Sequence, residues 1–157
     1  MADATTSGDF ERRTGGRDWL PHWAAARRRE LRFQRCARCR QWRHPPGPMC
    51  PACHTLEHEW ALASGRARLI SWVVMHPPVL PAWKERVPYA AVLVECAEGI
   101  RTIGGLVGAT PDALRMDMPM VVDFTPSPDG DLVPQWRIAP DPRFRLGSGA
   151  DGENGAR

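Results

Sequence analysis

The C-terminal half of the chain alternates between short apolar runs and short polar or glycine-containing breaks. The runs are rich in β-branched and aromatic residues, which is typical of strands, and they lie at 68–74, 89–96, 100–107, 120–125 and 132–138. Glu98-Gly99 predicts a tight turn between the second and third strands. Thr110 followed by Pro111 predicts a capped helical turn between the third and fourth. This is the element order of a five-stranded OB-fold barrel.

The pattern before residue 65 predicts a smaller and different unit. Apolar residues first recur at helical three- and four-residue steps, at Trp19, Leu20, Trp23 and Ala26. We expect Asp18 to be the N-cap of this short helix and Pro21 to lie in its first turn. Alternating residues then predict a strand over 31–35 and a returning strand over 57–62. The segment 40–49 contains three prolines and a glycine, so we expect an irregular loop there.

Four of the five cysteines form two Cys-x-x-Cys pairs separated by ten residues, namely Cys36, Cys39, Cys50 and Cys53. Two such turns can place four thiolates around one tetrahedral ion. Zinc is the expected metal, although iron bound as in a rubredoxin uses the same ligand set, and a redox dithiol pair is a third reading. Because four sulfurs fill four positions, we expect a structural site and no catalysis at the metal. His44, His54 and His58 lie close by and are expected to be solvated or to pack in loops.

Length and composition set the outer limits of the fold. The 157 residues suffice for one ordinary domain, or for a small module and a slightly larger one. We expect a helix plus ribbon over 18–63, an OB-fold domain over 64–140, and disordered ends at 1–17 and 141–157. No secretory signal and no apolar run of about 18 residues is found, so we expect no membrane span. Clustered thiols without an export signal indicate the reducing cytoplasm.

The charge distribution is consistent with a partner-facing surface. The net charge is +3, and eight arginines fall within 27–43 against a single acidic residue. The segment 84–131 is instead richer in acidic than in basic residues. A basic ribbon beside a mildly acidic domain suits nucleic acid, an acidic protein face or a phosphorylated cofactor. A solvated basic face without a partner is the other reading.

The order of these motifs resembles one known family. The matching segments are FQRCARC, PPGPMCPAC, SGRARLISWVV, VPYAAVLVECAEGIRTIGGLVG, a Pro-Asp-Ala-Leu turn, MPMVVDF and a closing Pro-x-Trp strand. They span about residues 18–138 and are similar to the acyl-CoA-associated family that joins a rubredoxin-like zinc ribbon to an OB fold. The chain departs from the family pattern at Asp117, where a glycine usually precedes the Met-Pro strand.

The resemblance implies a mainly β fold, zinc held by the four paired cysteines, and a role as a non-catalytic accessory subunit. Family members typically accompany enzymes of the thiolase superfamily. The resemblance therefore implies docking to a thiolase, aldolase or acyltransferase that holds the catalytic residues. It further implies that the subunit helps shape the acyl-CoA channel of this enzyme. Whether the subunit itself contacts acyl-CoA is not decided by the resemblance.

The residues themselves offer no catalytic constellation. Cys96 with His76 as its base is a candidate, but its strand neighbours indicate burial, where cysteine behaves as a small hydrophobe. No glycine-rich phosphate loop is found, since Gly104-Gly105 lies inside a predicted strand. Two glycines at this place predict a bend of the barrel. A nucleic-acid-binding ribbon and OB protein is the alternative function. OB folds that bind single-stranded nucleic acid usually display aromatic platforms on strands two and three. Here these strands offer Tyr89 and Arg101 and otherwise small or aliphatic residues, which disfavours this function.

Seven tryptophans in a short chain point to an apolar contact surface. The expected partner or acyl-CoA interface consists of Trp19, Trp23, Trp83, Lys84, Arg86 and Tyr89. Trp83 lies in a proline-rich loop over 76–86, whose apolar content is high for one small domain to bury, so a role in an interface is favoured over packing on the barrel. The two cations of this loop can attract the phosphates of coenzyme A.

Overall fold

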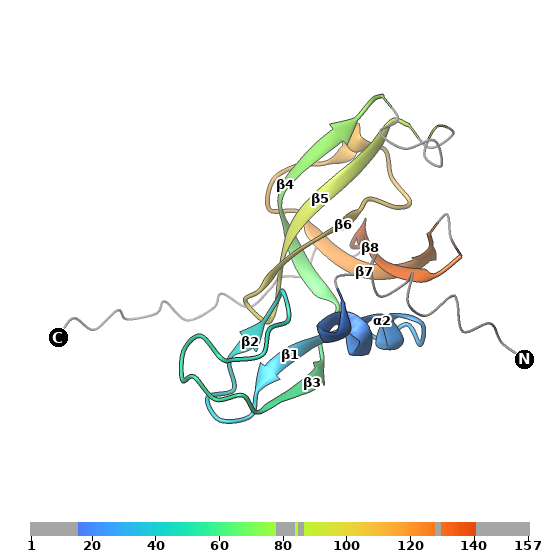
Figure 1. Ribbon diagram of the computed structural model, residues 1–157. Coiled ribbons are helices and arrows are strands. Elements are labelled where there is room, and N and C mark those ends of the chain that lie inside the picture. The colour runs from blue at the N-terminus through green and yellow to red at the C-terminus, as the bar shows by residue number, and fades with distance from the viewer. Residues whose placement is uncertain (1–15, 78–83, 85–86, 128–129, 141–157) are drawn as a thin grey trace, which may run out of the picture.

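The computed structural model describes residues 16–77, 84, 87–127 and 130–140 (Figure 1). These residues form a mainly β fold with a short N-terminal helix, a three-stranded ribbon sheet and a five-stranded barrel sheet, as predicted. The elements in chain order are η1 (Arg17–Trp19), α2 (Leu20–Ala26), β1 (Arg32–Cys36), β2 (Trp42–Arg43), β3 (His58–Leu62), β4 (Arg66–Met75), β5 (Tyr89–Cys96), β6 (Arg101–Gly105), η3 (Pro111–Ala113), β7 (Pro119–Pro126) and β8 (Leu132–Ile138). None of the helices in the described ranges has the length and hydrophobicity needed to cross a bilayer.

The ribbon sheet has the order β2-β1-β3, with β1 antiparallel to both neighbours. Strand β2 corrects the prediction that 40–49 is wholly irregular, because Trp42 and Arg43 pair with Arg35 and Gln34. A two-residue strand carries no periodicity of its own, so its pairing with β1 decides its conformation. The neighbouring strand β1 buries Phe33, Gln34 and Cys36.

The barrel sheet has the order β6-β5-β4-β7-β8. A parallel bridge between Leu106 and Trp136 brings the end of β6 to β8 and nearly closes the sheet. This is the topology of a five-stranded OB-fold barrel. Every second residue of β5 is buried, so the alternation seen in the sequence corresponds to an inner and an outer face of the barrel.

Close approach of β8 explains the two adjacent glycines of β6. The indole of Trp136 fills the barrel and is only 1% exposed. A Cβ atom at Gly104 would lie 2.8 Å from Trp136 Cδ1, and one at Gly105 would collide with the side-chain amide of Gln135. The N–H of Gly105 donates to Gln135 Oε1. The glycines therefore allow β6 and β8 to meet.

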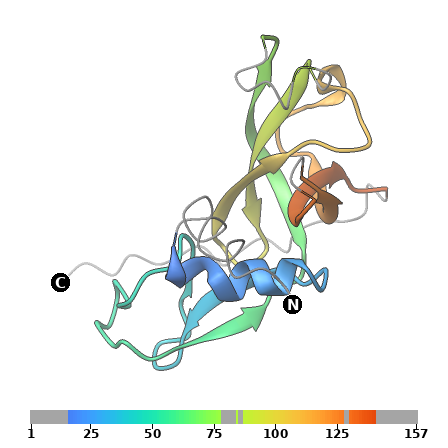
Figure 2. The ribbon, with the colours of Figure 1, turned by 45° about the vertical axis from the view of Figure 1, so that its right-hand side comes forward.

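Helix α2 lies between the ribbon and the barrel (Figures 1 and 2). Its C-terminal end is tied to the barrel, because Arg29 Nη1 donates to the carbonyl of Phe124 over 3.3 Å and Arg27 pairs with Asp131 at 3.2 Å. Pro21 lies in the first turn, as predicted. Asp18 is not the N-cap, since the 3-10 turn η1 begins before it, after Gly16, and no side chain caps either helix.

Two turns of the barrel show how the sequence meets its backbone requirements. Thr110 precedes Pro111 as predicted, but the turn is a single 3-10 turn and the Thr110 side chain makes no capping hydrogen bond. Asp117 has a φ of 62°, the left-handed region that favours glycine. Its carboxylate lies 2.8 Å from Arg68. Asp117 therefore adopts at this turn a conformation that a glycine would adopt without strain.

Candidate metal centre and ribbon–barrel groove

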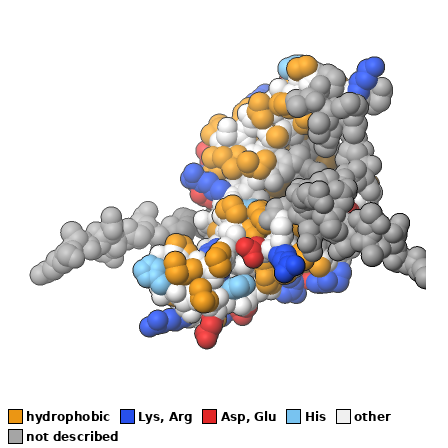
Figure 3. Space-filling view, in the orientation of Figure 1, with side chains coloured by type: hydrophobic (Ala, Val, Ile, Leu, Met, Phe, Trp, Pro, Cys, Tyr) orange, Lys and Arg blue, Asp and Glu red, His pale blue; other side chains and the backbone are white. Residues whose placement is uncertain are grey.

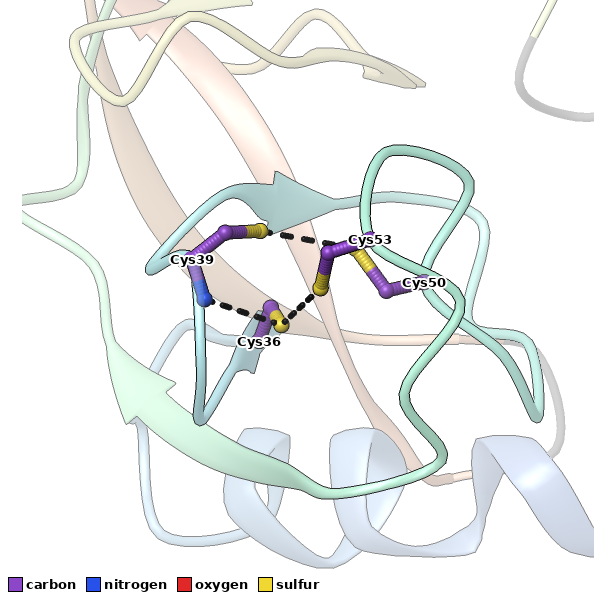
Figure 4. A group of neighbouring side chains, drawn as sticks. All are labelled: Cys36, Cys39, Cys50 and Cys53. Atoms are coloured by element: carbon purple, nitrogen blue, oxygen red, sulfur yellow. Dashed lines mark hydrogen bonds between the residues drawn. The ribbon is translucent and has the colours of Figure 1, made fainter.

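The two cysteine pairs meet at one point of the ribbon (Figure 4). The first pair begins at Cys36, the last residue of β1, and the second lies between β2 and β3. The Cys36 and Cys53 Sγ atoms are 3.5 Å apart, those of Cys39 and Cys50 are 3.6 Å apart, and all four lie within 4.8 Å of one another. Four sulfurs at about 2.3 Å from a tetrahedral zinc ion are separated by about 3.8 Å. The donor set and its spacing thus fit a four-thiolate metal-binding site.

The two cysteine turns have the same backbone hydrogen bonds. In the first, the N–H of Cys36 donates to Gln41 and the N–H of Arg40 donates to Cys36; in the second, Cys50 pairs with Thr55 and His54 with Cys50 in the same way. Arg40 and His54 occupy equivalent positions and have left-handed φ values of 64° and 59°. His54 therefore closes a turn and its side chain is exposed, which agrees with the prediction that it is no ligand.

The ionisation of the thiols is consistent with binding of a cation. A backbone hydrogen bond from Cys39 to Cys36 Sγ, 3.4 Å long, lowers the pKa of Cys36 to about 6. A backbone hydrogen bond at Gln41 lowers the pKa of Cys39, but hydrogen bonds with the neighbouring sulfurs and desolvation outweigh it and raise that pKa to about 12. Four thiolates at this spacing repel one another, and a metal cation removes this repulsion when it binds.

Aromatic and imidazole rings form a second cluster, where α2, the ribbon and the barrel meet. Trp19 stacks on Trp23 with ring centroids 6.1 Å apart, and His44 lies edge-on to Trp19 at 5.2 Å and to Phe33 at 4.8 Å. His44 Nε2 is 3.2 Å from Thr102 Oγ1 of β6, which links the ribbon to the barrel. Burial lowers the pKa of His44 to about 4, so the ring is neutral at pH 7.

Sequence reasoning missed His22 as a member of this ring cluster. Its ring is buried and its Nδ1 atom is 2.9 Å from the carbonyl oxygen of Arg32. Burial lowers its pKa as well. The available signal was helical spacing, because His22 follows Trp19 by three residues and therefore shares its helix face.

An apolar groove of about 500 Å³ lies beside this ring cluster. We name it the junction groove; its walls are Trp19, His22, Trp23, His44 and Pro45 on one side and Leu93, Arg101, Thr102, Ile103, Gly104, Gly105, Val133, Pro134 and Gln135 on the other. A second hollow of about 490 Å³ includes Tyr89 and shares Ile103, Gly104, Gly105 and Gln135 with the junction groove. Figure 3 shows hydrophobic side chains gathered over the barrel strands β4 to β6 on one face of the molecule.

The predicted interface residues fall into three groups. Trp19 and Trp23 meet in the junction groove, while Tyr89 lines the second hollow. Lys84 is exposed and lines neither of these two hollows. Trp83 and Arg86 lie outside the described residues.

Four of the eight arginines over 27–43 pair with acidic side chains in the described part of the chain; one of them, Arg27, pairs with Asp131. Arg28 and Arg32 both pair with Glu30, at 3.4 and 2.7 Å, and Arg40 pairs with Glu59 at 2.9 Å. Arg43 is buried, which removes it from the surface. These contacts reduce the free positive charge that the arginine count of the sequence predicts.

Cys96 is the described cysteine outside the metal site, and it is buried in the barrel. Desolvation raises the pKa of its thiol to about 12, with the nearby carboxylates of Glu98 and Glu95 adding to the effect. A thiol with this pKa stays protonated at neutral pH, whereas a nucleophile needs the thiolate. The side chain is therefore part of the core, as predicted.

Ribbon, four-cysteine site and barrel together define a protein that joins a zinc ribbon to an OB fold. Two family models match the chain in this order: the ChsH2 rubredoxin-like zinc ribbon domain over residues 23–59 and the ChsH2 C-terminal OB-fold domain over residues 60–125. A solved structure described as an Ltp2-ChsH2(DUF35) aldolase is 40% identical with a TM-score of 0.72, over 78% of this chain and 95% of that one. The chain belongs to the ChsH2 (DUF35) family.

Two curated relatives show how this unit is used in other proteins. A probable enoyl-CoA hydratase alpha subunit of Thermomonospora curvata is 40% identical over 115 residues, which are 73% of this chain and 35% of that protein. A DUF35 domain-containing scaffold protein of Methanothermobacter thermautotrophicus is 29% identical over 90 residues, which are 57% of this chain and 67% of that protein. The chain thus spans about a third of the length of the hydratase subunit.

Proposed function

We propose that this chain is a non-catalytic subunit that docks an enzyme of the thiolase superfamily and helps shape its acyl-CoA channel. The observation that carries the proposal is the match to the ChsH2(DUF35) part of an Ltp2-ChsH2 aldolase, which this chain covers almost completely. The scaffold description of the archaeal relative agrees with an accessory role. A thiolase, an aldolase or an acyltransferase is the expected partner, and the complex is hetero-oligomeric and cytoplasmic.

The metal in this proposal is zinc, bound by Cys36, Cys39, Cys50 and Cys53. Four soft thiolates at nearly tetrahedral spacing support zinc over harder ions. Zinc neutralises the thiolates and holds the two cysteine turns together, so its role is structural. The metal ribbon then belongs to the predicted unit 18–63, and the barrel to the unit 64–140.

The partner surface in this proposal includes Trp19, Trp23 and Tyr89, with the loop that carries Trp83, Lys84 and Arg86 as its continuation. The first three line two hollows that share β6. Large aromatic side chains at apolar hollows are typical of interface anchors. In this proposal the two cations of the loop attract the phosphates of acyl-CoA held by the enzyme.

Nucleic-acid binding is the weaker reading. OB folds that bind single strands use stacking platforms on the second and third barrel strands, here β5 and β6. The outer residues of these strands include one aromatic ring, Tyr89, whereas Ala91, Leu93 and Ile103 have no aromatic face. Arg101 pairs with Glu95 at 3.3 Å. Four of the eight arginines over 27–43 are also paired with carboxylates, which lowers the free positive charge of the ribbon.

Activity measurements test the non-catalytic role. The purified chain alone is expected to show no thiolase, aldolase or acyltransferase turnover, and Cys96→Ala in a reconstituted complex is expected to change turnover less than about twofold, because a protonated buried thiol takes no part in chemistry. The control is partner binding by the same variant. Loss of turnover with folding and assembly intact would assign a catalytic role to Cys96 and contradict the proposal.

A further inference from the structure

Among the strands that the structure describes, β6 pairs with β5 along one edge, and no strand is paired along the length of its other edge. The N–H of Cys96 donates to the carbonyl of Ile100, and the N–H of Leu106 donates to the carbonyl of Ala90. Since alternate residues of a strand direct their backbone groups to opposite sides, Thr102 and Gly104 also face β5. The backbone groups of Arg101, Ile103 and Gly105 therefore point the other way, toward β8.

Strand β8 contacts the second edge of β6 at one end of β6 and does not pair with the whole of that edge. The two strands are joined where the N–H of Val107 donates to Trp136, and the N–H of Gly105 is taken by the Gln135 side chain. No strand pairing joins Arg101 or Ile103 to β8 in the part of the chain that the structure describes. The backbone N–H and C=O groups of these two residues thus open into the junction groove.

Strand β8 lies against β6 at Gly104, where an added Cβ would be 3.2 Å from the carbonyl oxygen of Pro134, so the edge available for a further strand is limited to Arg101 and Ile103, which line the junction groove. Pro134 of β8 lacks an N–H, so β8 cannot supply a full hydrogen-bonding edge across the groove. Trp19 and Trp23 form the opposite apolar wall. The Ile103 side chain is 71% exposed, and its cross-strand neighbour is Leu93, which also lines the groove.

We propose that an extended apolar segment of the partner enzyme enters the junction groove and pairs with the free edge of β6. Pairing would satisfy the backbone groups of Arg101 and Ile103, as in other cases of strand addition. Alternate side chains of the segment would pack against Trp19 and Trp23 and against Leu93 and Ile103. This inference rests on the proposed function, since it names the contact through which the enzyme is held.

The chemistry of the groove favours a polypeptide over other occupants. An acyl chain offers no donors or acceptors in the alternating order of a strand edge. A single-stranded nucleic acid needs stacking faces and free cations, but Trp19 and Trp23 stack on each other and Arg101 pairs with Glu95. An extended backbone supplies both the alternating hydrogen bonds and the apolar side chains.

Amide hydrogen exchange on the full chain tests the free edge and its occupation. In the free protein the amides of Arg101 and Ile103 are expected to exchange at least tenfold faster than those of Thr102 and Gly104, which are paired with β5. Addition of a purified thiolase-like enzyme, the proposed partner, is expected to slow Ile103 exchange at least tenfold. Thr102 in the same samples is the internal control.

Two substitutions at Ile103 separate backbone pairing from side-chain packing. Ile103→Pro removes the N–H that faces the groove and spares every hydrogen bond to β5, so the fold is expected to persist while enzyme affinity falls more than tenfold. Ile103→Ala keeps the N–H and is expected to weaken binding less. Circular dichroism and melting of each variant check the fold, and if Ile103→Pro does not fold, the exchange protection of Ile103 in the wild-type complex decides.

Each other outcome overturns the inference. Equal binding by Ile103→Pro and wild type, with Ile103 unprotected in the complex, would reject the groove and leave the proposed function intact. Failure of the enzyme to bind the wild-type chain would reject both. Protection of Ile103 by octanoyl-CoA, by single-stranded DNA or by self-association of the chain without enzyme would assign the groove to another occupant.

Discussion

The ribbon and the barrel are stabilised in different ways. The buried polar side chains of the described residues, His22, Gln34 and Arg43, all lie in the helix and ribbon half of the chain. The ribbon strands are short, and two of the four metal-site cysteines are among the most buried residues there. The barrel instead buries alternate apolar residues of long strands around Trp136.

This difference indicates what each region requires. A sheet of two to five residues per strand buries too little apolar surface to offset the entropy of ordering it, so we expect the ribbon to depend on a metal. The barrel has a core of its own, to which Leu31 and Phe33 of the ribbon side also contribute. Removal of the metal is therefore expected to unfold the ribbon and spare the barrel, whereas truncation of the barrel core is expected to destabilise the barrel and spare the metal site.

Metal removal is expected to have the largest effect. Cys50→Ser, or a strong chelator, should abolish exchange protection in β1 and β3 while β4 and β5 stay protected. Apparent zinc binding free energies in small zinc modules are about 10–16 kcal/mol, and much of this is folding free energy. The measurement is residue-resolved amide exchange with metal analysis, which should give about one zinc per wild-type chain. Cys96→Ala is the control, and a metal-free wild type with a protected ribbon would contradict the account.

Truncation of the barrel core should produce the converse result. Trp136→Ala is expected to lower the free energy of unfolding by about 3–5 kcal/mol, because it leaves a large cavity between β6 and β8. Zinc content below the melting transition should be unchanged. Denaturant unfolding measures the loss, and Val73→Ala on the exposed barrel surface should stay within about 0.5 kcal/mol of wild type. Simultaneous loss of zinc would show that the two regions do not fold independently.

The contact between the two regions should depend on pH. The pKa of His44 falls from an ordinary value of 6.5 to about 4 on folding, so the folded state favours the neutral ring. This contribution to stability is complete above pH 6.5 and is lost as the pH falls from 6.5 through about 4. After discounting partial exposure it is on the order of 1–3 kcal/mol.

The matched variant for this prediction is His44→Gln, whose amide can still reach Thr102 but does not titrate in this range. Its unfolding free energy should fall less steeply between pH 6.5 and 4 than that of the wild type. The thiols, the carboxylates and the neighbouring His22 titrate in both proteins, so the difference between the two curves reports His44 together with its repulsion with His22. Parallel curves would mean that His44 is not buried at the junction.

Local residue patterns in the sequence were sufficient to predict most of the strands and the metal site. The strands predicted at 89–96 and 132–138 match β5 and β8 residue for residue. The spacing of the cysteines alone was enough to predict that they meet. Where the sequence failed, at Asp18 and at β2, the outcome depended on a neighbouring turn or on a paired strand, which local periodicity does not contain.

The junction groove was beyond sequence reasoning for a different reason. Trp19, His44 and Ile103 lie on the helix, a ribbon loop and a barrel strand, and their proximity results from packing between the two regions. Sequence order gives no distance across such a contact. Trp19 and Trp23 were identified as interface candidates from composition, but the strand edge opposite them was not.

Association measured across a salt series tests the central claim most directly. The chain and its proposed thiolase-like partner enzyme should form a stable complex whose affinity changes little between low and physiological salt, because the contact is mainly apolar. Single-stranded DNA should bind weakly, with an affinity that falls steeply over the same range. Tight, sequence-tolerant DNA binding together with no association with the enzyme at any salt concentration would contradict the account.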